Sequence, residues 1–72
     1  MNRAEHLAWA KTRALEYLLD GQDTRNAIAS MTSDLGKHPD LADHPGRNVG
    51  VMLAATELDS PEQVRGWIEG IA

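Results

Sequence analysis

The 72-residue sequence contains no cysteine, which excludes disulfide bonds and thiolate metal sites. No stretch approaches the roughly 20 consecutive apolar residues that a membrane-spanning helix needs. The first residues are polar and periodic, without the apolar run of a signal peptide. We therefore expect a cytoplasmic protein that neither spans nor binds a membrane.

The sequence also lacks an excess of positive charge. Its net charge is −4, and basic and acidic residues cancel over 1–37, so residues 38–72 carry the whole imbalance. Contacts to phosphate groups need a basic surface, so we expect no direct binding of nucleic acid. The acidic half either keeps the small protein in solution or meets a basic surface on a partner protein.

Motifs of common enzyme and cofactor sites are missing as well. No glycine-rich phosphate loop occurs, and no histidine stands at a suitable spacing from the serines near Asp34 to form a nucleophile–base pair. A chain of this length buries only about 60% of the surface that its unfolded form exposes, which disfavours a deep active-site cleft. We expect neither enzymatic activity nor a bound cofactor.

Helical signals dominate the first half of the chain. Asn2 is a good N-cap, and apolar residues follow it at helical spacing until Asp20-Gly21 ends the helix. Asp23 or Thr24 can cap a second helix, which Gly36 stops. Its apolar stripe consists of Ala27, Ile28, Met31 and Leu35.

The second half predicts two further helices. Pro45 suits the first turn of a helix whose apolar pattern is Val49, Met52, Leu53 and Leu58, and Gly46 and Gly50 permit close backbone approach. Ser60, Pro61 and Gln63 form the strongest start signal in the sequence, a capping box. The stripe that follows consists of Val64, Trp67, Ile68 and Ile71.

The predicted fold class is therefore all-α, a single domain over residues 1–72 with four helices in two antiparallel hairpins. The first hairpin covers about 2–36, the linker 37–44 and the second hairpin about 45–71. The first hairpin resembles the tetratricopeptide pattern: a small residue and an aromatic, a glycine turn, Ala-Ile, a large apolar residue and then proline. This resemblance implies tetratricopeptide-like local geometry, although two hairpins are too few for a stacked solenoid.

A narrower resemblance spans nearly the whole chain. The segments "NRAEHLAWAKTRALEYL", "SMTSDLGKHP" and "WIEG" are similar to a group of small uncharacterised proteins encoded by bacteriophages and prophages. The sequence departs from them in its longer Gly21-Gln22-Asp23 turn. The resemblance implies a virus-encoded accessory protein that acts inside a bacterium. It implies no particular chemical activity.

One strip of the first helix combines residue types that dominate binding hot spots. His6, Trp9, Arg13 and Tyr17 lie beside its core face. Two interpretations remain open: a surface that binds a partner, or the edge of the core with Arg13 stacked on an aromatic ring. Two acidic residues of the last helix complete the predicted partner-binding set, Glu62 and Glu69.

The segment "KHPDLADHPG" carries residues that can ligate a metal, His38, Asp40, Asp43 and His44. Their spacing matches no established ligand pattern, and each histidine precedes a proline. We interpret the segment as the end of one helix and the start of the next, so no metal site is assigned. The metal interpretation would regain support if His38 and His44 faced each other across a carboxylate.

The resulting functional hypothesis is protein–protein binding, to a host bacterial protein or complex. An anti-defence protein, such as an inhibitor of a CRISPR effector, is one form that fits the phage setting. Two alternatives stay open. One is a structural homodimer that buries Trp67 and Ile71, and the other is a metal-binding protein that uses the His-Pro segment.

Overall fold

The structure, a computed structural model, describes the backbone of residues 2–56 and 60–72 and the side chains of residues 2–52 and 60–72. Within these residues the chain forms no strand and four helices: α1 (Arg3–Leu19), α2 (Thr24–Leu35), α3 (Pro45–Thr56) and α4 (Pro61–Gly70). The predicted all-α fold class is confirmed. Leu53 and Leu58, which were predicted as part of the apolar pattern of the third helix, lie outside the described side chains.

Local sequence explains where three of these helices begin. Asn2 accepts a hydrogen bond from the backbone N–H of Glu5 at the start of α1, and Asp23 accepts one from the N–H of Asn26 at the start of α2. At α4, Ser60 and Gln63 form the reciprocal capping box. Each cap satisfies backbone donors that the first helical turn leaves without a partner.

The turn between α1 and α2 depends on a glycine. Gly21 has a φ of +91°, a conformation that a side chain with a Cβ rarely adopts. Gln22 follows with a φ of 54°, and the chain then enters α2 after its Asp23 cap. The predicted helix end at Asp20-Gly21 is therefore confirmed.

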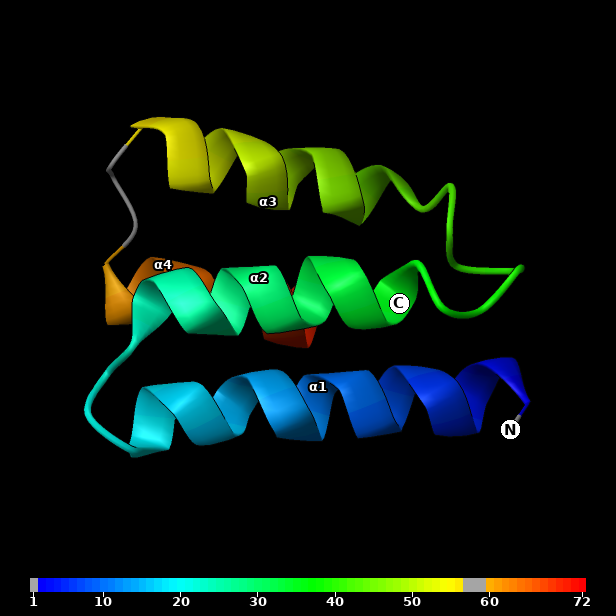
Figure 1. Ribbon diagram of the computed structural model, residues 1–72, viewed down its shortest axis with the longest axis horizontal. Helices are drawn as coiled ribbons and strands as arrows, with labels where there is room; N and C mark the ends of the chain where they lie inside the picture. Colours follow the sequence, from blue (N-terminus) through cyan, green and yellow to red (C-terminus); the bar gives the residue numbers. More distant parts are fainter. Residues whose placement is uncertain (1, 57–59) are drawn as a thin grey trace.

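Helix α2 is the centre of the molecule. It contacts α1, α3 and α4, while α1 and α3 lie on opposite sides of it (Figure 1). Helix α4 lies behind α2 in this view and contacts the other three helices. Successive helices run in opposite directions (Figure 1). None of the described helices is long and apolar enough to cross a lipid bilayer.

The core joins α1, α2, α4 and the segment before α3. Small alanines of α1 and α2 let these two helices approach closely, and larger side chains fill the remaining space. Leu41, in the predicted linker, is fully buried, which the sequence pattern did not indicate. The core consists of Leu7, Ala10, Ala14, Leu18, Ala27, Ile28, Met31, Leu35, Leu41, Val64, Ile68 and Ile71.

Helix α3 presents its glycines to the rest of the protein. A Cβ on Gly50 would lie 2.5 Å from a ring atom of Trp67, and Trp67 Nε1 donates a 2.8 Å hydrogen bond to the carbonyl of Gly46. Because this face packs inward, Val49 and Met52 point outward and are 46% and 64% exposed. The predicted packing of those two side chains is wrong, whereas the close approach at Gly50 is confirmed.

Candidate functional site

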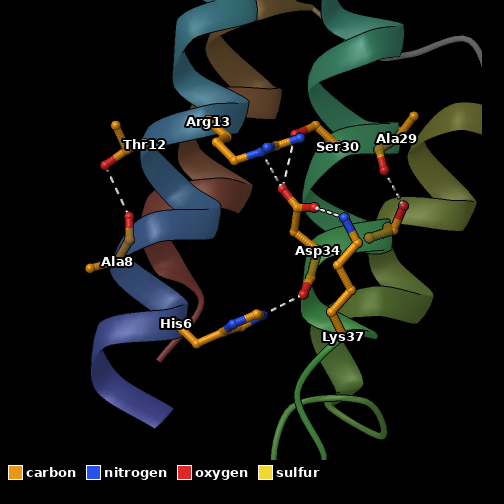
Figure 2. A network of polar contacts seen from close by, with 9 residues as sticks. His6, Ala8, Thr12, Arg13, Ala29, Ser30, Asp34 and Lys37 are labelled. Atoms are coloured by element: carbon orange, nitrogen blue, oxygen red, sulfur yellow. Dashed lines mark hydrogen bonds and ion pairs between the residues drawn. The ribbon is translucent and has the colours of Figure 1, made fainter. Parts of the chain in front are cut away.

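A buried carboxylate, that of Asp34, is the centre of a polar cluster that joins α1 and α2. The side chain of Asp34 is 1% exposed, yet it has three polar partners (Figure 2). Arg13 Nε lies 2.9 Å from its Oδ2, Lys37 Nζ lies 3.0 Å from its Oδ1, and Ser30 Oγ lies 3.4 Å from Oδ2. Burial of a carboxylate is costly without such partners, so this cluster fixes the position of Arg13 and Lys37 relative to each other.

His6 lies inside this cluster rather than on the surface. It is 7% exposed, and its Nε2–H donates a 2.6 Å hydrogen bond to the backbone carbonyl of Asp34 (Figure 2). Its ring contacts the rings of Trp9 and His38, each with a centroid separation of 5.1 Å. His6, predicted to lie beside the core face of the first helix, is held in the α1–α2 contact by the carbonyl of Asp34 in the last turn of α2.

Trp9 covers the outer edge of the cluster. It is partly buried and packs against the core, while Arg13 Cζ lies 4.8 Å and Lys37 Nζ 5.7 Å from its ring. Both separations fall within the range of cation–π attraction. Arg13 and Lys37 side chains are nevertheless 47% and 56% exposed. Trp9 therefore covers the edge of the core, with Arg13 against its ring, and both cations stay about half exposed.

Beyond Arg13 the strip reaches an open hollow near the end of α1. Tyr17 is 39% exposed and Leu19 76% exposed. They line an open hollow of about 590 Å³ together with Arg13, Glu16 and Asp20. Three of the five lining side chains are charged, so the hollow is a shallow surface of mixed polarity and differs from an enclosed, mostly apolar small-molecule site.

The acidic residues of the predicted partner-binding set lie elsewhere. Glu62 and Glu69 are exposed on α4. Helix α4 meets α1 on the side of Lys11, whose Nζ donates a hydrogen bond to the carbonyl of Glu69. Lys11 is two positions, or about 200° of helix rotation, from both Trp9 and Arg13. The structure therefore does not place Glu69 with the α1 strip.

The two histidines of the His-Pro segment have separate partners. His38 contacts His6, and its Nδ1 accepts a hydrogen bond from the N–H of Asp40. His44 accepts one from the N–H of Gly46 and donates one from Nε2 to the carbonyl of Ala72. They do not face each other across a carboxylate. Over residues 2–56 and 60–72, no group of three or more histidine, aspartate or glutamate side chains is placed to hold a metal ion.

The surface assigned to the homodimer alternative is used within the protein itself. Ile71 is 4% exposed and belongs to the core. Trp67 packs against Gly50 and donates its indole hydrogen bond to Gly46. Ile71 is therefore already covered by its own chain, and Trp67, which is partly buried, is already packed on α3.

Asp34 and Lys37 are parts of the site that were not predicted from the sequence. A signal was present, since Asp34 stands three positions after Met31 and one before Leu35, inside the apolar stripe of α2. A charged residue on a buried helix face needs a partner from another element. The identity of that partner depends on how α1 and α2 align, which spacing within one helix does not reveal.

No protein-family model, curated protein or solved structure matches this chain. The tetratricopeptide-like geometry and the resemblance to phage proteins therefore stay predictions from the sequence.

Proposed function

We propose that this protein acts by binding another protein. The proposed contact surface, called the α1 strip below, consists of Trp9, Arg13 and Tyr17 together with Leu19 at the end of the helix. The observation that carries the proposal is the hollow beside Tyr17 and Leu19, with the anchored guanidinium of Arg13 at its edge. Exposed tyrosine, arginine and large aliphatic side chains in one depression are typical of protein interfaces.

The anchoring of Arg13 supports this proposal energetically. A free arginine loses rotamer freedom when it binds, whereas the ion pair with Asp34 and the contact with Trp9 already restrict this side chain. Its 47% exposure leaves room for further contacts. A partner that meets Arg13 therefore gains an oriented donor at a small cost in conformational entropy.

The partner that we propose is a host bacterial protein or complex, and the resemblance to phage-encoded proteins supports this setting. An anti-defence role, such as inhibition of a CRISPR effector, is one form of the proposal. The charge of −4 carried by residues 38–72 supports a partner with basic surface nearby. Glu62 and Glu69 would contribute to such attraction from α4, separately from the strip.

Affinity capture from a bacterial lysate tests the proposal with substitutions that leave the core intact. We expect Tyr17→Ser combined with Leu19→Ser to lose at least one protein that the original sequence captures, because both side chains are exposed. Asn48→Ser, at an exposed position of α3 across α2 from α1, is the matched control and should retain it. Recovery of the same proteins with all three forms would contradict the assignment of the strip.

A further inference from the structure

Arg13 and Lys37 are two cations that share one counterion. They reach the carboxylate of Asp34 from α1 and from the segment after α2, at 2.9 Å and 3.0 Å (Figure 2). Among the described residues, no other carboxylate forms an ion pair with either cation. The cluster therefore carries one positive charge more than its buried carboxylate neutralises.

Both cations keep hydrogen-bond donors that the protein itself does not use. A guanidinium has five N–H donors and a lysine ammonium has three. Arg13 meets Asp34 through Nε, and neither of its Nη groups donates a hydrogen bond within the side chains described, 2–52 and 60–72. Lys37 donates to Oδ1 of Asp34. Two free Nη groups form a planar fork, which binds a carboxylate through two parallel hydrogen bonds.

The ring of Trp9 restricts the same two cations from a second side. Arg13 Cζ lies 4.8 Å and Lys37 Nζ lies 5.7 Å from the centre of this ring. Because they share both the carboxylate of Asp34 and this ring, the two cations lie close together on one face of the protein. An anionic group that meets both of them therefore orders little that is not already ordered.

The acidic residues of α1 lie on the other side of Arg13. Glu16 and Asp20 follow Arg13 along the helix and line the hollow with it, whereas Trp9 lies one turn before it. Positive charge is thus in excess around Trp9, and negative charge around the hollow. A chain of phosphates along α1 would meet the two carboxylates, so this pattern favours a single acidic side chain over nucleic acid.

We propose that Arg13 and Lys37 bind one carboxylate, that of an aspartate or glutamate on a partner protein, beside the ring of Trp9. This inference rests on the protein-binding function proposed above and names the chemistry of the partner at this end of the α1 strip. An exposed ion pair contributes little by itself. The isolated carboxylate therefore binds weakly and adds to the other contacts of the strip.

NMR titration of the full chain with two blocked amino acids tests this inference. N-acetylglutamate amide carries a side-chain carboxylate, and N-acetylglutamine amide is its neutral match. At constant ionic strength, we expect the glutamate probe to shift the indole N–H signal of Trp9 saturably and the glutamine probe to leave it in place. The indole of Trp67, which donates to the carbonyl of Gly46, is the internal reference and should not respond.

Charge-removing variants locate the binding of the glutamate probe. Arg13→Gln and Lys37→Gln should each weaken it at least about threefold, because each removes one of the two cations. Arg3→Gln is the matched control, since it removes an exposed positive charge about 15 Å earlier along α1 and should leave the affinity unchanged. Circular dichroism verifies that each variant remains helical.

Three results of the titration would overturn the proposal: no saturable shift, an equal shift with the glutamine probe, or equal weakening by Arg3→Gln. Binding of N-acetylphosphoserine amide without binding of the glutamate probe would overturn it too, by assigning the two cations to a phosphate. The titration uses no lysate, so its failure leaves the capture of a partner through Tyr17 and Leu19 standing. Failure of that capture, in turn, leaves the measured probe binding standing.

Discussion

Asp34 shows how one residue organises the surface proposed for binding. Its buried carboxylate holds Arg13 from α1 and Lys37 from the segment after α2, and both cations also approach the ring of Trp9. Each cation is about half exposed. Because two cations pair with the same carboxylate, loss of either one leaves it a charged partner. Loss of both leaves a buried charge without a counterion, which is far more costly.

This arrangement predicts a strongly non-additive effect on stability. Arg13→Gln or Lys37→Gln alone should lower the free energy of unfolding by about 1 kcal/mol or less. The double substitution should cost at least about 1 kcal/mol more than the sum of the two. Urea unfolding followed by circular dichroism measures all three values.

The Asp34→Asn background is the control for that coupling. A neutral amide has no charge that requires a counterion, so the two substitutions should become additive there. Additive losses in the original sequence, or the same coupling in the Asp34→Asn background, would show that the carboxylate is not what links the two cations.

Among single residues, the helix caps could be predicted from the sequence, whereas buried contacts between helices could not. The cap residues Asn2, Asp23 and Ser60 were predictable, because a cap bonds to a backbone group only three positions away. The burial of His6 could not be predicted in this way, because its partner is the carbonyl of Asp34, 28 positions along the chain. Contacts between helices depend on their relative alignment, and amphipathic spacing fixes only which face of each helix is apolar.

At the scale of elements, α3 differs from the other helices in what it turns inward. Its sequence pattern suggested that Val49 and Met52 pack against the protein, yet Gly46 and Gly50 occupy that side. The ring of Trp67 is larger than any aliphatic side chain and needs a flat backbone surface, which glycine provides. The bulky partner on α4 therefore determines the orientation of α3. The glycines of α3 indicated a close approach, but they did not identify Trp67 as the partner.

Two glycine substitutions test this packing. Alanine normally stabilises a helix interior relative to glycine by about 0.5–1 kcal/mol. We expect this gain for Gly66→Ala in α4, where an added Cβ would meet nothing within 4 Å. Gly50→Ala should instead destabilise the protein, because its Cβ would lie 2.5 Å from Trp67 and 2.9 Å from Thr32.

Thermal unfolding monitored by circular dichroism compares the two variants directly. A rise in melting temperature for Gly66→Ala and a fall for Gly50→Ala would support the packing of α3 on Trp67. A rise for both would mean that Trp67 does not lie against the α3 backbone.

At the scale of the whole molecule, the central position of α2 separates two surfaces of different chemistry. The α1 strip offers an aromatic ring, fixed cations and an open hollow, whereas α3, across α2, exposes Val51 and Met52 beside the polar Asn48 (Figure 1). The all-α fold was predictable from caps and periodicity. The separation of the two surfaces could not be predicted, because it depends on which helix occupies the centre of the molecule.

Site-specific photo-crosslinking in bacterial cells tests the proposed binding role most directly. Tyr17 would be replaced by the photoreactive amino acid p-benzoylphenylalanine, with the same replacement at the exposed Asn48 of α3 as the control. We expect a covalent adduct with a bacterial protein from position 17 and none from position 48. No adduct from position 17, or the same adducts from both positions, would contradict it.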